Sequence, residues 1–279
     1  MIKTPLEPLV ITDTNLSRAW ARSFLHLLDN PGTEISPLVV SISGFDTHDQ
    51  VTESADIRAG LDVVFAETDN WDVETVAFTI FPQRYWQLAN GDRKKLFAIY
   101  RDAFPRLQAM NRRDNRRGLY FERLTMYGRG PCDGNQLEWI LSQYKPEGGV
   151  IRSKFQASTF DPERDQLPDA RLGFPCLQHV TFIPTPAGLV LNAFYATQQL
   201  FDKAYGNYLG LAHLGAFMAH EMKIPLARLN TYIGVAQKGT INKTSEKLKA
   251  LIPILRRDID RAAGHQTVNK PTAAVRVPA

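Results

Sequence analysis

The segment 201–222 constrains the fold of this 279-residue chain more than any other. A helix over these residues would be apolar around much of its circumference, through Tyr205, Tyr208, Leu209, Leu211, Ala212, Leu214, Phe217 and Met218. Such a helix has no broad face for water, so other elements must cover it on most sides. The sequence therefore predicts a long, buried central helix.

The remaining patterns supply elements that could cover this helix. Helical apolar spacing marks 17–28, 53–67, 93–111 and 245–262, with a shorter capped helix at 133–141. Strand-like composition marks 38–43, 75–81, 151–159, 180–183 and 189–195, the last two forming a hairpin. Because strands and helices do not alternate regularly, we expect an α+β fold, a mixed β-sheet covered by helices. A single domain over 1–262 and a mobile C-terminal tail over 263–279 are expected.

The composition excludes several classes of protein. With 44% hydrophobic and 22% charged residues, the chain is typical of globular proteins, and it contains no apolar run long enough to span a membrane. The N-terminus lacks the charge and apolar pattern of a signal peptide, and two cysteines do not make a disulfide framework. A cytoplasmic location is therefore expected.

The formal net charge of +4 is concentrated in the arginine-rich segment 112–117. One interpretation is a contact with phosphate or nucleic acid. The other is a solvated loop whose arginines interact with the C-terminal dipole of the preceding helix. Because no aromatic residues interleave with these arginines as stacking platforms, we favour the loop and expect no nucleic-acid partner.

Cys176 is the candidate nucleophile, because it follows Pro175 at the start of an expected strand. Thiolates react, and cations such as Arg171, five residues upstream, favour the thiolate form. The alternative is a small buried apolar residue. In a regular strand Cys176 and Gln178 share one face while His179 points to the other, so Gln178 is the expected neighbour.

No metal site is expected. His213 and His220 lie seven residues apart, whereas the zinc metalloprotease motif needs two histidines four apart with a glutamate between them. Cys132 has no partner at a metal-binding spacing.

Several motifs occur in the order used by the thymidylate synthase and deoxycytidylate (dCMP) hydroxymethylase superfamily, which the chain resembles over about 118–243. Pro175 and Cys176 precede a hairpin that ends in Tyr195, and Asn207 follows Gly206 at the start of the long helix. Upstream of them lie 120–124, 135–137 and 152–153 in the family's order. The resemblance implies a thymidylate-synthase-like fold and a homodimer formed through the sheet, with 1–117 divergent.

The resemblance also implies a chemistry. Cys176 would add to C6 of a pyrimidine nucleotide or a derivative, and C5 would then accept a one-carbon unit from 5,10-methylenetetrahydrofolate. Asn207 would bind the N3 and O4 edge of the ring, which suits a uracil-type base because an amide both donates and accepts. An acid on an N-terminal helix would relay protons, and Asp62 or Glu53 is the candidate. The product would be methylated or hydroxymethylated.

The chain departs from the family where the nucleotide phosphate and sugar are held. The family's phosphate-binding arginine is missing from 195–199, where Gln198 stands, and Gln237 lies where the family has a sugar-binding residue. Arg152 would still reach phosphate, because the family supplies such arginines from the neighbouring subunit. Two interpretations therefore remain: an enzyme with an altered substrate, or a non-catalytic dimeric scaffold or nucleotide sensor.

Overall fold

The computed structural model describes residues 7–68, 70–113, 115, 117–168 and 175–268. The strands are β1 (Leu9–Asp13), β2 (Glu34–Ile35), β3 (Leu38–Ile42), β4 (Gln156–Ser158), β5 (Leu177–Thr185), β6 (Gly188–Gln199) and β7 (Leu226–Gln237). The helices are α1 (Leu16–Asp29), α2 (Ala55–Ala66), α3 (Val73–Ile80), α4 (Gln83–Ala89), α5 (Arg93–Met110), α6 (Tyr120–Thr125), α7 (Gln136–Gln143), α8 (Pro162–Asp165), α9 (Tyr205–Met222) and α10 (Glu246–Val268). Short turns of 3-10 helix occur at Cys132–Gly134 and Arg152–Lys154, and a π-helical turn at Leu200–Ala204.

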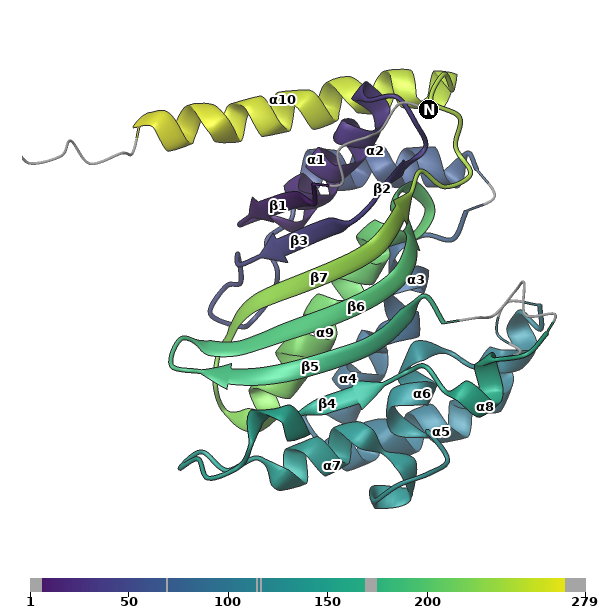
Figure 1. Ribbon diagram of the computed structural model, residues 1–279, viewed down its shortest axis with the longest axis vertical. Helices are drawn as coiled ribbons and strands as arrows, with labels where there is room; N and C mark the ends of the chain where they lie inside the picture. Colours follow the sequence, from purple (N-terminus) through teal and green to yellow (C-terminus); the bar gives the residue numbers. More distant parts are fainter. Residues whose placement is uncertain (1–6, 69, 114, 116, 169–174, 269–279) are drawn as a thin grey trace, which may run out of the picture.

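The described strands form one mixed sheet, which confirms the expectation of a sheet covered by helices (Figure 1). Its strand order is β1-β3-β7-β6-β5-β4, with β2 pairing beside β7. β1 is parallel to β3 and β6 is parallel to β7, while the other pairs are antiparallel. Within the described ranges, none of the helices combines the length and the apolar composition that crossing a lipid bilayer requires.

Helix α9 confirms the expected buried central helix. It connects β6 to β7 behind the sheet, and its buried residues occupy every side of the helix. Two glycines let α3 pack directly against it: a Cβ atom on Gly206 would lie 2.6 Å from Val76 Cβ, and one on Gly210 would lie 2.6 Å from the Ala77 carbonyl oxygen. The contact between α3 and α9 is therefore one of close backbone approach.

The expected strand at 75–81 is wrong, because this segment belongs to helix α3. Asp72 caps the helix by accepting a hydrogen bond from the Thr75 backbone N–H at 2.6 Å. The buried residues follow the helical i, i+3, i+4, i+7 spacing: Val73, Val76, Ala77 and Ile80. The β-branched composition favours a strand, but packing against α9 decides the outcome.

The expected strand at 151–159 forms only over β4, whose outer edge is closed by a side chain. Gln136 Nε2 donates to the Ser158 carbonyl oxygen at 2.8 Å, and the Ser158 N–H donates to Gln136 Oε1 at 2.9 Å. One amide thus pairs with the strand as a neighbouring backbone would. It satisfies polar groups that an edge strand otherwise leaves open to another chain.

Most other elements confirm the sequence predictions: α1, α2, α5, α7, β3 and the β5–β6 hairpin. The C-terminal helix α10 continues through Val268, beyond the predicted end at 262. The rest of the predicted tail, 269–279, lies outside the described residues. Helix α10 lies against α1 and α2, where Ser54 Oγ donates to Asp258 Oδ2 at 2.7 Å and Arg256 pairs with Asp29 at 2.6 Å.

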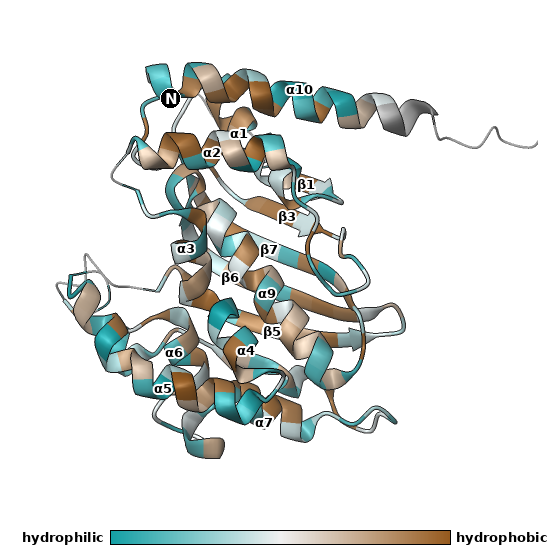
Figure 2. Cartoon of the chain, turned by 180° about the vertical axis from the view of Figure 1, so that it is seen from behind, coloured by the Kyte–Doolittle hydropathy of each residue, from teal (hydrophilic) through white to brown (hydrophobic). Residues whose placement is uncertain are grey.

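The helices gather on one face of the sheet, and the other face is open along β5, β6 and β7 (Figures 1 and 2). An in-register row of hydrogen-bonded side chains crosses this open face from Ser41 through Asn230 and Asn192 to Thr181. Beside the row, Phe194 and Tyr232 stack with ring centroids 5.5 Å apart. These rings remain 38% and 45% exposed, so the open face carries an apolar centre.

Candidate functional site

Cys176 lies at the end of the sheet where β5 begins and β6 ends. Its side chain is partly buried, and its Sγ atom is 3.6 Å from the Thr197 hydroxyl. The Ala196 N–H donates to the Cys176 carbonyl oxygen at 3.0 Å, which fixes the thiol-bearing residue against β6. The thiol is thus held by the sheet but remains accessible, as a nucleophile must be.

Two tyrosines from different elements, Tyr120 on α6 and Tyr195 on β6, lie near this thiol. The Tyr120 hydroxyl accepts a hydrogen bond from the Leu177 N–H at 3.4 Å. Burial raises the pKa of Tyr120, of Tyr195 and of Tyr208, and the nearby Cys176 raises the first two further. All three phenols are therefore neutral at pH 7, and those of Tyr120 and Tyr195 can act as hydrogen-bond donors beside the thiol.

Two buried amides lie at the end of β6 and at the start of α9. Gln198 is 2% exposed; its Oε1 accepts from the Tyr208 hydroxyl at 3.1 Å, while its Nε2 has no partner among the described residues. Asn207, adjacent to Tyr208 in the first turn of α9, is 5% exposed. The hydrogen bonds of the described residues leave its amide unused. A buried amide nitrogen without a partner is unfavourable, so Gln198 is suited to binding a polar ligand.

The neighbourhood of Gln178 differs from the expectation. A register shift between Leu177 and His179 interrupts the alternation of β5, so the predicted common face for Cys176 and Gln178 does not follow. The side chain of Gln178 is partly buried. His179 pairs with Phe194 on the open face, and the same register shift removes the basis for expecting Cys176 and His179 on opposite faces.

The other predicted binding residues are not gathered around the thiol. Gln237 is exposed at the end of β7 and pairs with Gln199. It therefore lies two residues further along the sheet than Thr197, the residue that contacts the thiol. Arg152 is exposed in the turn before β4, and β4 pairs antiparallel with β5 in the register Gln156 with Thr181. Arg152 therefore lies toward the opposite end of β5 from Cys176. Arg171 lies outside the described residues.

The structure does not bring the predicted acid Asp62 to Cys176. Asp62 lies on α2, where its half-exposed carboxylate pairs with Arg58 at 3.1 Å. Arg58 also pairs with Glu53 at 3.3 Å and with Glu74 at 2.9 Å. Sequence reasoning missed Glu74, because the adjacent residues 75–81 were assigned to a strand; the helical spacing of α3 was the signal that could have found it.

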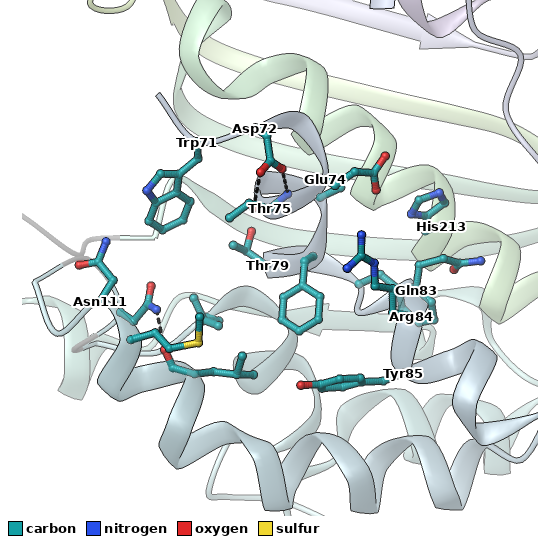
Figure 3. Close-up of a pocket in the computed structure, with 17 residues that line it drawn as sticks. Trp71, Asp72, Glu74, Thr75, Thr79, Gln83, Arg84, Tyr85, Asn111 and His213 are labelled. Carbon is teal, nitrogen blue, oxygen red and sulfur yellow. Dashed lines mark hydrogen bonds between the residues drawn. The ribbon is translucent and has the colours of Figure 1, made fainter. Parts of the chain in front are cut away.

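A cavity of about 790 Å³ lies between α3, α4 and α5 (Figure 3). Trp71 and Asn111 lie at one end, and Glu74, Gln83, Arg84 and His213 gather toward the other. Phe78, Phe81 and Tyr85 contribute aromatic walls. The cavity therefore combines flat apolar surfaces with a polar end, as ligand-binding pockets do.

Two links in the chain connect this cavity to the thiol site. Trp71 lines the cavity, and the Lys203 ammonium lies 4.1 Å from the centre of the Trp71 ring. Lys203 precedes Asn207 by four residues in the chain. Leu119 also lines the cavity and directly precedes Tyr120, which binds the backbone beside Cys176. The cavity and the thiol thus border the same group of elements.

His213 places an imidazole at the polar end of the cavity, from helix α9. Its Nδ1 atom is buried and has no hydrogen-bond partner within the described ranges. Burial lowers the pKa of His213, and Glu74 opposes this effect only in part. The imidazole is therefore neutral at pH 7 and can exchange hydrogen bonds with a ligand.

Comparisons with known proteins assign no family to this chain. No protein-family model matches the chain, and no curated protein sequence matches it. In the part of the chain that the structure describes, no three His, Cys, Asp or Glu side chains gather in a way that would hold a metal ion.

Proposed function

We propose that this protein transfers a one-carbon unit to C5 of a pyrimidine nucleotide or a derivative, through a covalent bond between Cys176 and C6 of the ring. The observation that carries the proposal is the partly buried thiol at the strand end, in contact with Thr197, whose neighbour Gln198 has a buried amide nitrogen without a partner within the described residues. The resemblance to the thymidylate synthase superfamily supports the same chemistry, in which Cys176 and Asn207 hold corresponding positions.

The steps follow from the chemistry of the ring. The Cys176 thiolate donates an electron pair to C6, and the C5–C6 π electrons move toward O4, forming an enolate. Asn207 donates a hydrogen bond to O4 and so stabilises the developing charge. C5 would then bond to the one-carbon unit, and loss of the C5 proton would expel the carrier nitrogen to leave an exocyclic methylene group. Addition of hydride from the carrier, or of water, to that methylene would expel the Cys176 thiolate from C6, restore the ring double bond and give the methyl or hydroxymethyl product.

The cavity beside the site fits the carrier 5,10-methylenetetrahydrofolate, which supplies the one-carbon unit at the formaldehyde oxidation level. Its aromatic walls at Trp71, Phe78 and Tyr85 suit flat pterin and benzoyl rings. Arg84 lies exposed at the cavity and forms no ion pair within the described residues, so its planar fork is free for a carboxylate. Glu74 replaces Asp62 as the acid proposed to hold the C5 proton.

We further propose that the protein is a homodimer formed through the open face of its sheet. A second copy would cover the exposed Phe194–Tyr232 stack, and the amide row across the strands offers donors and acceptors to an identical row. Because Arg152 lies toward the opposite end of β5 from Cys176, it would serve the site of the other subunit. Arg152 of the partner subunit is thus the proposed phosphate ligand.

The second candidate function is a nucleotide sensor or non-catalytic scaffold that keeps the site without the reaction. It is favoured by the surroundings of Cys176, whose Sγ atom contacts the hydroxyl of Thr197 and, among the described residues, forms no hydrogen bond with a cation or an imidazole.

Intact-protein mass spectrometry with 5-fluoropyrimidine nucleotides and methylenetetrahydrofolate tests the proposal. Fluorine at C5 cannot leave as a proton does, so the covalent complex should accumulate on the wild-type protein and on Cys132→Ala. Cys176→Ala should form none. Cys132 is the matched control because it is the other cysteine and is exposed.

Two results would contradict an enzyme that acts on these substrates. One is the absence of any adduct with 5-fluoro-dUMP, 5-fluoro-UMP and 5-fluoro-dCMP; the other is an adduct that persists in Cys176→Ala. Thermal stabilisation by nucleotide alone, without an adduct, would instead support the sensor.

A further inference from the structure

The positive charge of the chain is concentrated in one segment. Residues 93–117 contain nine Lys and Arg against two Asp, a formal charge of +7, whereas the whole chain carries +4. The remaining residues therefore carry −3 in total. Helix α5 and the residues directly after it account for all of the basic excess.

On α5 the charges lie on the outer side of the helix. Arg93 faces inward, where it pairs with Glu138 at 2.8 Å and Glu221 at 2.8 Å. The exposed cations form two rows along the helix. Lys94 and Arg101 make up the first row, and Lys95 and Arg106 make up the second, on the neighbouring side. We call these four residues the α5 cationic face. Exposed Ala98, Asp102, Pro105 and Ala109 lie between the two rows, and exposed Arg112 follows the end of the helix.

The cations of this face are not neutralised within the described part of the chain. Neither the α5 cationic face nor Arg112 forms an ion pair there, although Arg58, Arg129 and Arg256 on other surfaces do. Asp102 is the acid that α5 itself contributes. Like charges on adjacent turns repel one another, so a bound polyanion would relieve an unfavourable term.

The cationic face also remains accessible in the proposed dimer. Helix α5 lies on the helical side of the molecule, opposite the open face of the sheet (Figures 1 and 2). A partner bound to α5 and a second copy bound to the open face would therefore not compete. The inference made here goes beyond the proposed function and does not require Cys176.

We propose that the α5 cationic face binds the phosphate backbone of a nucleic acid. The four cations of the face, from Lys94 to Arg106, span about 18 Å along α5 at the rise of an α-helix, long enough to follow several phosphates. Small side chains between the rows let a backbone approach closely, and arginine matches phosphate oxygens in a bidentate way. An interfacial membrane helix would instead need bulky apolar residues between its cations. The sequence alone favoured a solvated loop at 112–117; the structure adds the four cations of α5 to the same basic segment.

Fluorescence anisotropy with a labelled 20-nucleotide oligothymidylate tests this proposal on the full chain. The wild-type protein should bind at 50 mM salt, and affinity should fall steeply as salt rises, because binding releases counterions. The triple variant Lys94→Glu, Arg101→Glu, Arg106→Glu should bind at least tenfold more weakly. Its salt slope should be smaller by about 2, because three single-strand phosphate contacts contribute roughly 0.7 each.

The control variant carries the same three charge reversals at exposed sites on other elements, Lys154→Glu, Lys249→Glu and Arg257→Glu. It should lose less than threefold in affinity. An equal loss in both variants would show a response to net charge and overturn the proposal. Failure of the wild-type protein to bind would also overturn it, as would binding only to vesicles that contain phosphatidylserine. A glutamine triple variant at the α5 positions repeats the test if the glutamate variant does not fold.

Discussion

At the scale of single residues, two amides and one imidazole define what the site can bind. Gln198 and Asn207 are buried with hydrogen-bonding capacity left over, and His213 has a buried nitrogen without a partner in the described residues. Groups of this kind are kept where a ligand completes them. Sequence motifs pointed to Asn207 and Gln198, whereas His213 entered the sequence analysis only as a metal ligand to be excluded.

Asn207 should determine which pyrimidine forms the covalent adduct. An aspartate that carries a proton can donate to N3 of cytosine, but it lacks the amide donor that O4 of uracil needs. Asn207→Asp should therefore slow adduct formation with 5-fluoro-dUMP at least tenfold and raise the rate with 5-fluoro-dCMP relative to it. Mass spectrometry over time measures both rates. Asn242→Asp is the exposed control, and an unchanged preference in Asn207→Asp would remove this residue from the ring-binding role.

His213 should make the fold less stable in acid. Because burial lowers its pKa below 6.5, the unfolded chain takes up this proton at a higher pH than the folded one. Its contribution to stability is therefore present above pH 6.5 and is lost as the pH falls toward the lowered value. Urea unfolding of His213→Gln should show a smaller decrease in stability from pH 7 to pH 5 than the wild type shows. Equal decreases would contradict the prediction.

At the scale of elements, the contact between α3 and α9 shows where sequence reasoning succeeds and fails. The apolar circumference of 201–222 identified α9 because no other arrangement buries such a helix. Helix α3 was missed because Thr75, Val76, Thr79 and Ile80 favour strands, and only its neighbour's glycines make the helical packing possible. That information lies about 130 residues away in the chain.

Gly206→Ala should destabilise the protein through this contact. The new methyl group would lie within 2.8 Å of the Val73 carbonyl oxygen and 2.6 Å of Val76 Cβ, so the helices must separate. Overpacking of this kind costs about 1–3 kcal/mol. Gly264→Ala in α10, where no atom lies within 4 Å of the added Cβ, should leave stability unchanged or raise it. Urea unfolding compares the two, and equal effects would contradict close packing as the cause.

At the scale of the whole molecule, the open face of the sheet is the proposed dimer interface, and the outer side of α5 is the proposed surface for a charged partner. The mixed sheet and its helical cover could be predicted from local patterns and the order of motifs. The position of Arg152 relative to Cys176 could not, because it depends on the register of β4 on β5. That Asp62 does not lie beside Cys176 likewise depends on where α2 packs, which local patterns do not show.

The open face should determine the oligomeric state. Phe194→Asp would place a charge in the centre of the proposed interface without a partner and should convert the dimer to a monomer. Sedimentation equilibrium at micromolar concentrations measures this directly. Leu88→Asp, at a residue that is 64% exposed on α4, is the control and should remain dimeric. A wild-type protein that is monomeric at 50 µM would contradict the proposed dimer.

The pairing of the two ends of the chain has a consequence for synthesis on the ribosome. Strand β3 pairs with β7 from Leu38–Ile233 to Ile42–Leu229, and α10 packs on α1 and α2. The first 66 residues therefore emerge long before the elements that cover them. Their apolar surface stays exposed until almost the whole chain has been translated, at a rate of about 5–20 residues per second. These first 66 residues are thus the part of the nascent protein on which a chaperone would act.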